Sequence, residues 1–474
     1  MTLELIAGME HREPLSQMLN RRELLRRTAT GVPLTALYGL LASESVAAKD
    51  PARDGSSETT VSPPHHTPRA KSVIFLFMGG GPSQVDLFDP KPEIAKHKTI
   101  PIELPHIKRD ATANCMPSPY TFRRHGESGI WMSELLPHLA PLADELCVIR
   151  SMTCDHIEHS GALKQFLTGD GFFPRPSIGA WILYGLGSEA EDLPGFVFID
   201  RQVNAPGKQL YGSRFLPVAY EGTFIRDLGR PVDNLELLVP GRVQSNKLDL
   251  LRHLNEKYRR GREEDSRLDA RIASYELAFR MQTAAPQAFD LSQESAATHK
   301  LYGIGEKITD DYARKCLLAR RLVERGVRFV VVNIDNQWDH HAEVRDHEKS
   351  AAATDQPVAA LLKDLRSRGL LDETLVVWGG EFGRTPTAQS KGRDHHPYGF
   401  TMWMVGGGMK RGVTHGATDD FGFFAVEDKV HVHDLHATIL HLLGIDHQRL
   451  TYSYSGRDFR LTDVAGNVLH DLLV

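Results

Sequence analysis

The sequence predicts an α/β fold in which helices cover both faces of a mostly parallel central sheet, as a three-layer sandwich. Short apolar segments recur along the chain, as expected for strands buried on both faces. They lie at residues 73–78, 147–152, 329–334 and 374–378. Between the last two, apolar residues repeat at helical spacing over 358–365. Residues rich in Asp, Glu and His follow the strand ends, where open α/β sheets place their sites.

Length and charge narrow the class of protein. The chain has 474 residues and is 41% hydrophobic, which is enough to bury one large core or two smaller ones. A net charge of −5 gives no basic field, so we expect no binding to nucleic acid. No apolar segment reaches the roughly 20 residues that a membrane-spanning helix needs, so we expect no stable membrane span.

The N-terminus is typical of an export signal. Arg21 and Arg22 precede a short apolar segment at 31–42, and small residues follow at the position of a cleavage site. We interpret residues 1–48 as a twin-arginine signal peptide and residues 49–70 as a linker. The protein is then exported by the twin-arginine machinery and is periplasmic or secreted. An ordinary basic amphipathic helix is the alternative.

The first expected strand, at residues 73–78, leads into a glycine-rich turn and then Asp86 and Asp89. Glycine lets the backbone turn tightly beneath a ligand, so one of these carboxylates is a candidate site residue. The turn is not a dinucleotide-binding fingerprint, because a proline follows the glycines and would end the required helix. A plain strand-to-loop connection is the alternative.

The second expected strand, at 147–152, is followed by His159 and Ser160 just before an expected helix at 161–169. A helix N-terminus favours an anion, such as a phosphate or sulfate group. Ser160 is therefore a candidate nucleophile, and His159 a candidate ligand or acid. Serine at such a position is also a common helix cap.

The middle of the chain differs in character. After an expected strand at 196–200, residues 202–305 include a highly charged stretch at 246–281 with leucines at helical spacing. This pattern predicts a charged helical insertion outside the sheet, which could cover the site. A solvated pair of helices with no catalytic part is the alternative.

Two strands of the C-terminal third lead into loops that are typical of a metal site, because they combine carboxylates with imidazoles. The candidate residues of these loops are Asp335, His340, His341, Glu381, Arg384, His395 and His396. Further on, the sequence predicts a strand at 400–405 and a helix at 433–443 that ends at a glycine.

The order of these motifs resembles the alkaline phosphatase and sulfatase superfamily. More closely, the segments 80–92, 380–386, 392–397 and 432–440 resemble motifs of DUF1501, an exported family of unknown function. The resemblance covers roughly residues 70 to 465. It implies an alkaline phosphatase-like fold over residues 71–474, with the helical insertion near 202–305.

The resemblance also implies two divalent metal ions at the carboxyl edge of the sheet. Asp335, with His340 or His341 and one of His395 and His396, would bind one ion. Asp86 and Glu381 would bind the second ion. Zinc, manganese, calcium and magnesium are the candidate ions, and two ions about 4 Å apart stabilise the attacking and leaving oxygens of an ester. Arg384 would then bind the equatorial oxygens in bidentate fashion.

Two departures from the superfamily pattern limit this assignment. Phe382 follows Glu381 where many phosphatases of the superfamily have histidine, so one ligand is missing or comes from elsewhere, for example from His159. The nearest match to a formylglycine signature begins at Cys115 and lacks the arginine, so we do not expect a formylglycine sulfatase.

The sequence therefore predicts an exported metal-dependent hydrolase that acts on phosphate or sulfate esters of a small molecule or polysaccharide. The nucleophile is Ser160 or a metal-activated water. The alternative is a non-catalytic relative that serves as a metal-containing binding or structural protein. Hydrolysis is favoured because buried carboxylates are costly without a cation.

Overall fold

A computed structural model describes residues 62–104, 107–201, 206–226 and 285–474, together with scattered residues between 228 and 281. The predicted signal peptide and most of the charged stretch at 246–281 lie outside the described residues. Among the residues that the structure does describe, no helix is long and apolar enough to cross a membrane.

In the described part of the chain, nine strands form one central sheet. Its order is β14 (Val413–His415), β6 (Cys147–Thr153), β13 (Phe400–Val405), β10 (Thr374–Gly379), β1 (Ser72–Phe77), β9 (Phe329–Asn333), β7 (Phe196–Ile199) and β8 (Thr223–Ile225), with β17 (Val430–His431) beside β6. All neighbours are parallel except β13, which is antiparallel to β10 and to β6. The predicted mostly parallel sheet is therefore confirmed.

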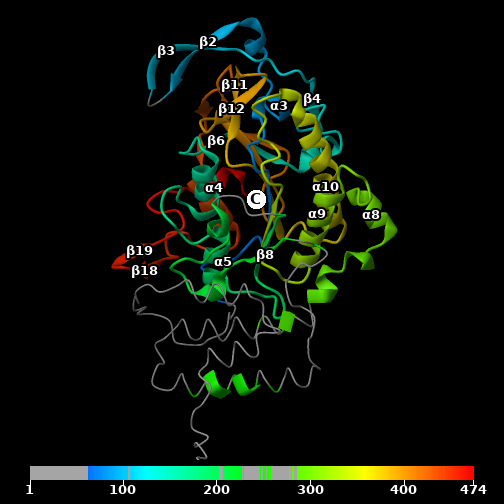
Figure 1. Cartoon of the computed structure of the whole chain (residues 1–474), viewed down its shortest axis with the longest axis vertical. Helices are drawn as coiled ribbons and strands as arrows, with labels where there is room; N and C mark the ends of the chain where they lie inside the picture. Colours follow the sequence, from blue (N-terminus) through cyan, green and yellow to red (C-terminus); the bar gives the residue numbers. More distant parts are fainter. Residues whose placement is uncertain are drawn as a thin grey trace, which may run out of the picture.

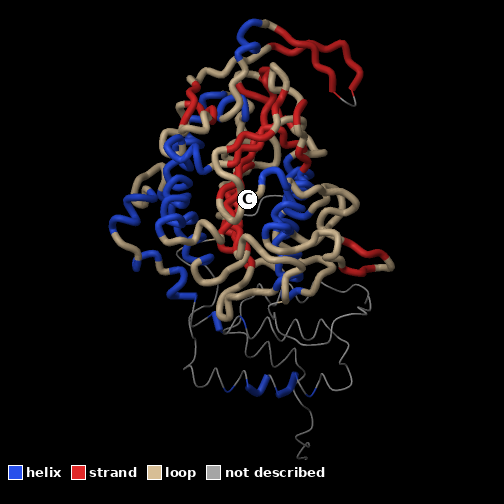
Figure 2. Tube along the Cα trace, turned by 180° about the vertical axis from the view of Figure 1, so that it is seen from behind, coloured by secondary structure: helices blue, strands red, loops and turns tan. Residues whose placement is uncertain are grey.

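Helices cover both faces of this sheet (Figures 1 and 2). One face packs against α8 (Ala296–Tyr302), α9 (Asp310–Val323) and α10 (His347–Ser367), and the other against α4 (His159–Thr168), α5 (Ile178–Leu186) and α11 (Val432–Leu442). Strand β1 serves both cores, because successive side chains point to opposite faces. Ile74 and Leu76 lie in the first core, and Val73 and Phe75 lie in the second. The three-layer sandwich is thus confirmed.

Smaller elements surround the sheet. The two-stranded ribbons are β2 (Thr99–Leu104) with β3 (Ile107–Asn114), β4 (Phe122–His125) with β5 (Ile130–Ser133), β11 (Gly383–Gln389) with β12 (Gly392–His396), β15 (Ala417–Thr418) with β16 (Ala425–Glu427), and β18 (Tyr452–Tyr454) with β19 (Arg457–Phe459). A short helix, α3 (Gln84–Leu87), follows the glycine turn after β1. The ribbon of β11 and β12 follows β10 at the carboxyl edge of the main sheet.

The two described ends of the region at 202–305 lie in the main fold, whereas most of the charged stretch that predicts the insertion lies outside the described residues. The first part of the region contributes β8, which pairs with β7 inside the main sheet, and its last part contributes α8, which packs against α10. A strand of three residues is too short to produce a periodic sequence pattern, so it escaped prediction. The described ends of the region therefore belong to the main fold.

Residues 62–70, predicted as the end of a linker, lie against the main fold. The His65 amide donates to the Gly444 carbonyl oxygen at 2.8 Å, and the Arg69 amide donates to the Leu442 carbonyl oxygen at 2.8 Å. Ala70 is buried among core residues. Residues 62–70 thus contact the main fold.

The start of α11 provides a test of local stability. Asp434 accepts a hydrogen bond from the His431 amide at 2.8 Å, which closes a capping box, and another from the Asn467 amide at 2.7 Å. We expect Asp434→Ala to lower the free energy of unfolding by about 2 kcal/mol, the upper end for a lost cap, because the Asn467 amide also loses its partner. Denaturant unfolding would measure this loss. Glu427→Ala, in the exposed ribbon before α11, serves as the control and should change stability by less than about 0.5 kcal/mol.

Candidate metal centre

Three segments that follow strand ends converge at the carboxyl edge of the sheet. β6 leads to His159 at the start of α4, and β9 leads to Asp339 and His341. β10 leads into the β11–β12 ribbon, which carries His395. Because β6, β9 and β10 run in the same direction, their carboxyl ends meet at one edge.

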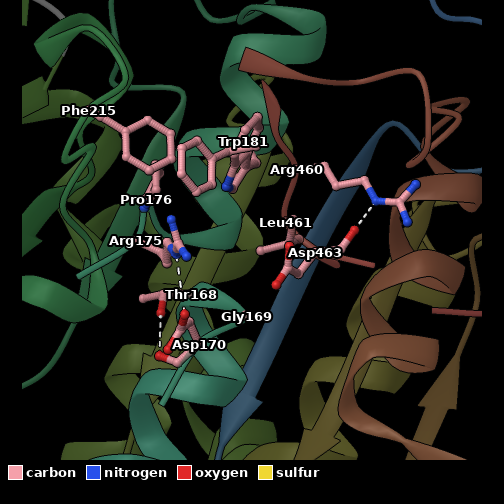
Figure 3. Close-up of a pocket in the computed structure, with 11 residues that line it drawn as sticks. Thr168, Gly169, Asp170, Arg175, Pro176, Trp181, Phe215, Arg460, Leu461 and Asp463 are labelled. Atoms are coloured by element: carbon pink, nitrogen blue, oxygen red, sulfur yellow. Dashed lines mark hydrogen bonds and ion pairs between the residues drawn. The ribbon is translucent and has the colours of Figure 1, made fainter. Parts of the chain in front are cut away.

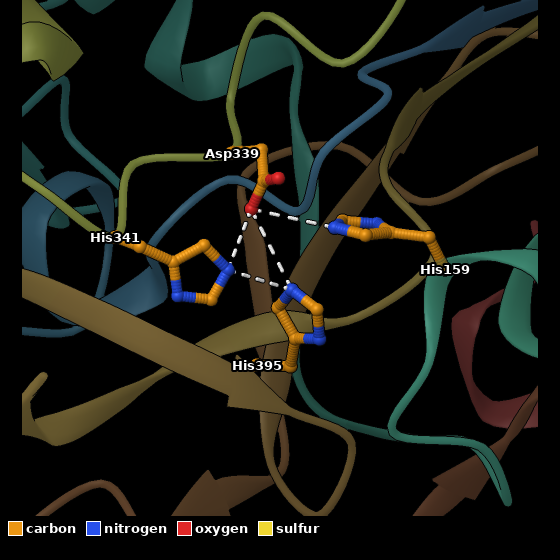
Figure 4. A group of neighbouring side chains, drawn as sticks. All are labelled: His159, Asp339, His341 and His395. Atoms are coloured by element: carbon orange, nitrogen blue, oxygen red, sulfur yellow. Dashed lines mark hydrogen bonds and ion pairs between the residues drawn. The ribbon is translucent and has the colours of Figure 1, made fainter.

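These four side chains form a compact group around one carboxylate oxygen (Figure 4). Their ligand atoms all lie within 4.8 Å of one another. The Asp339 Oδ1 atom lies 2.9 Å from His341 Nε2, 3.3 Å from His159 Nε2 and 3.5 Å from His395 Nε2. Three imidazole nitrogens with one carboxylate oxygen suit zinc and similar divalent metals.

The hydrogen bonding of the group is compatible with a bound cation. His159 Nε2 is buried and makes no hydrogen bond, because the Asp339 oxygen at 3.3 Å is close enough for an ion pair but is not aligned. His341 Nε2 and His395 Nε2 also face each other at 2.9 Å. A buried polar atom without a partner costs free energy, and a metal ion would satisfy His159 Nε2 while also binding the other two nitrogens. The residues present therefore fit a divalent ion.

Electrostatics favours an ionised Asp339. Burial would raise the pKa of this carboxyl, but its contacts with His159, His395 and Arg384 hold it well below its usual range. Burial also opposes protonation of His159, yet the carboxylates of Asp339 and Glu381 outweigh it and raise the pKa of His159 to about 9. A metal ion bound there would have to displace a proton from His159.

Glu381 lies behind His159 and is not one of the four residues. Its Oε1 atom lies 2.6 Å from His159 Nδ1, and the Gly80 amide donates to the same oxygen at 3.0 Å. Gly80 has a φ of 102°, and a Cβ atom there would lie 2.6 Å from the Asp339 amide nitrogen. Only glycine therefore fits at position 80, where the turn after β1 meets the loop that carries Asp339.

Arg384, predicted to bind substrate oxygens, is 0% exposed. Its Nη2 donates to Asp339 Oδ1 at 2.6 Å, its Nε donates to the Gly81 carbonyl at 3.0 Å, and its Nη1 donates to the Arg393 carbonyl at 3.1 Å. The structure thus places its guanidinium behind Asp339, where its nitrogens donate to protein oxygens.

Asp86, predicted as a ligand of a second ion, lies apart from the four-residue group. Arg393 holds both its oxygens, with Nε at 2.6 Å from Oδ2 and Nη2 at 3.0 Å from Oδ1. Ser83 also donates to Oδ2 at 2.5 Å. Burial opposes ionisation of Asp86, but Arg393 lowers its pKa to about 2. This carboxylate is fully paired within the protein.

The structure also separates the neighbouring histidines. His340 points to Ser350, with its Nε2 atom 2.9 Å from the hydroxyl, and His396 is buried against the Phe423 carbonyl. Burial lowers the pKa of both imidazoles to about 4. Of each adjacent pair that the sequence left open, His341 and His395 belong to the group and their neighbours do not.

The carboxylate of the group is Asp339, which the sequence analysis did not name as a ligand. Asp335, the predicted ligand, lies two residues after the end of β9 in a left-handed conformation with φ of 52° and is not part of the group. The missed signal is the position of Asp339 directly before the two histidines.

Ser160 is exposed in the first turn of α4, directly after His159. The N-cap of this helix is Glu158, so Ser160 does not cap it. Ser160 is therefore an exposed residue next to His159 in the sequence.

A small pocket lies at the other end of α4, lined by Thr168, Gly169 and Trp181 among others (Figure 3). The ten-residue helix spans about 15 Å, which separates this pocket from His159. Asp170 and Arg175 pair across it at 3.2 Å, and its free volume of about 10 Å³ is roughly that of one water. It is distinct from the metal centre.

The structure is similar to several solved structures at low sequence identity. One is the lipoteichoic acid synthase LtaP from Listeria monocytogenes, at 9% identity and a TM-score of 0.35, covering 85% of this chain and 78% of that one. Another is a protein in the alkaline phosphatase superfamily from Vibrio parahaemolyticus, at 10% identity and a TM-score of 0.37, covering 81% and 69%. A third is the phosphonate monoester hydrolase SpPMH from Silicibacter pomeroyi, at 11% identity and a TM-score of 0.35, covering 85% and 76%.

No curated protein matches the chain. The sequence model of the family described as "Protein of unknown function (DUF1501)" matches residues 70–473, which is nearly the whole described domain. The resemblance inferred from the motifs is thereby confirmed, and the chain belongs to the DUF1501 family.

Proposed function

We propose that this protein is an exported metal-dependent hydrolase of phosphate or sulfate esters. One observation carries the proposal. Three imidazole nitrogens and one carboxylate oxygen, from His159, Asp339, His341 and His395, converge within 4.8 Å at the carboxyl edge of the sheet. A divalent ion held there would supply Lewis acidity and lower the pKa of a bound water.

The residues around the centre have separable roles in this proposal. Arg384 and the hydrogen-bonded loops hold the Asp339 carboxylate in place. The first-turn amides of α4 lie next to His159 and favour the oxygens of an anionic group. The Ser160 hydroxyl is exposed at the same turn and is the candidate nucleophile, with water as the alternative.

We propose one ion instead of the two that the superfamily resemblance implies. Asp86 is neutralised by Arg393, and Glu381 is occupied by His159 and the Gly80 amide. Neither carboxylate needs a second cation to offset its burial. The proposal includes no formylglycine chemistry. Cys115, where the nearest match to that signature begins, forms an isolated antiparallel β-bridge with Thr387.

A second candidate function is supported by the burial of the nearby arginines. Arg384 and Arg393 are both 0% exposed and paired with protein carboxylates, so neither guanidinium is free to hold an anionic substrate. A metal-containing binding or structural protein would have no need of such a group.

Metal analysis combined with a substrate panel tests the proposal. The protein, produced with its own export signal, is analysed for bound metals and then assayed on aryl phosphate, phosphodiester and sulfate esters. We expect about one ion per chain and hydrolysis of at least one ester class. Chelation should abolish turnover, and zinc, manganese, calcium or magnesium should restore it. A bound ion without turnover on any ester would favour the binding or structural role, and absence of metal would contradict both.

Ser160→Ala separates the two nucleophiles. If the serine attacks, the variant loses turnover while its metal content stays unchanged. If water attacks, turnover persists. Ser128→Ala, at another exposed serine, is the control for nonspecific effects.

A further inference from the structure

Glu381 has an environment that a surface carboxylate never has. It is 0% exposed, and the Gly80 amide donates to both of its oxygens, at 3.0 Å and 3.3 Å. The Cys154 thiol donates to its backbone carbonyl at 3.3 Å. The side chain is therefore fixed just after the end of β10, and its Oε1 atom is available as a strong hydrogen-bond acceptor.

That acceptor faces His159. The Oε1 atom lies 2.6 Å from Nδ1, on the side of the ring away from the other ligands, while Nε2 faces Asp339. A carboxylate only accepts, so this contact keeps the hydrogen on Nδ1 and leaves the Nε2 lone pair for a metal. The contact with Glu381 therefore sets both the orientation of the His159 ring and its tautomer.

Phe382, the next residue, completes the support. Its ring lies 4.9 Å from the ring of His159 and stacks at 4.6 Å on the ring of His395, measured between centroids. The residue that stands where a ligand was expected thus packs against two of the three imidazoles. These contacts hold both rings in place before a metal ion binds, so less rotational freedom is lost on binding.

We propose that Glu381 is a positioning residue that orients His159 toward the ion and is not itself a ligand. This inference rests on the proposed function, because it takes the four-residue group as the metal centre. Carboxylates that hold a ligand histidine in this way contribute about 10- to 100-fold to metal affinity.

Competition titration tests the inference on the full exported protein. Metal-free wild type, Glu381→Ala and Glu381→Gln are titrated with zinc against a chelator of known affinity. We expect the alanine variant to bind zinc about 10- to 100-fold more weakly, still at one ion per chain. The glutamine variant keeps an acceptor oxygen for Nδ1, so its affinity should lie nearer to wild type.

A spectroscopic readout separates positioning from ligation. X-ray absorption of the zinc-loaded proteins should show the same nitrogen and oxygen ligands in Glu381→Ala as in wild type. Loss of an oxygen ligand, or unchanged zinc affinity in the alanine variant, would overturn the inference. Glutamine and alanine variants of equal affinity would overturn it too. Glu348→Gln, at an exposed residue of α10, is the matched control.

Failure of the wider proposal looks different. If wild type itself binds no zinc, the metal centre and the proposed function fail together. If wild type binds zinc and only the variants disagree, the metal centre stands and Glu381 has another role. Thermal unfolding of the metal-free proteins shows whether each variant is folded before titration.

Discussion

Arg393→Ala is expected to lower the free energy of unfolding by about 3–5 kcal/mol, because it leaves the Asp86 carboxylate buried without its partner. Both side chains are 0% exposed, and the guanidinium binds the carboxylate through two nitrogens. Urea unfolding would measure the change as a lower midpoint with an unchanged slope. Arg393→Lys should recover only part of the loss, since an ammonium does not reproduce the two-point geometry.

Acid provides a control for the same pair. The pKa of Asp86 is about 2 in the folded protein, below its ordinary value of 3.8. A lowered pKa stabilises the fold above pH 4, and this contribution is lost as the pH falls toward 2. The difference in stability between wild type and Arg393→Ala should therefore narrow over that range. A constant difference would contradict the role of the Asp86 charge.

The metal content of Asp86→Asn decides what this carboxylate does. We expect the variant to be less stable but to keep about one ion per chain, because Asp86 is paired within the protein and lies apart from the four-residue group. If the folded variant loses bound metal relative to wild type, Asp86 is a ligand, as the superfamily resemblance implies.

The strands that could be predicted are those with strong local patterns. The apolar segments at 73–78, 147–152 and 329–334 became β1, β6 and β9 with boundaries within one residue. β8, β14 and β17 have three, three and two residues, and so short a segment carries no periodic signal. The antiparallel direction of β13 depends on how the chain returns, which composition does not encode.

The site was predictable to the level of the sheet edge but not of the individual side chain. Adjacent residues in a strand point to opposite faces, so His395 and His396 in β12 have opposite environments, and sequence alone does not say which faces the site. The same limit applies to His340 and His341 in the loop after β9. The sequence also does not show which residues far apart in the chain pair with each other, such as Asp86 and Arg393, which are 307 residues apart.

Neighbouring residues with opposite environments give the sharpest test of the ligand set. We expect His341→Ala, His395→Ala and Asp339→Ala each to weaken zinc binding by more than about 100-fold. A direct ligand should contribute more than the 10- to 100-fold of a residue that holds a ligand from behind. The matched changes His340→Ala, His396→Ala and Asp335→Ala should weaken zinc binding by less than about tenfold, because these side chains lie outside the group. Competition titration of the metal-free proteins measures both sets.

Stability measured with and without zinc also separates the two sets. His340 hydrogen-bonds Ser350, and His396 is buried against the Phe423 carbonyl, so removing either imidazole should destabilise the metal-free protein by about 1–3 kcal/mol. Removing His341 or His395 also breaks hydrogen bonds, to Gln389 and to the Ile157 carbonyl oxygen, and should cost the metal-free protein a similar amount. In the presence of zinc only the His341 and His395 variants should lose further stability relative to wild type, because binding to the folded state adds stability only where the ligands are intact. If each adjacent pair of variants behaves alike with and without zinc, these four histidines do not divide between a metal centre and the surrounding protein.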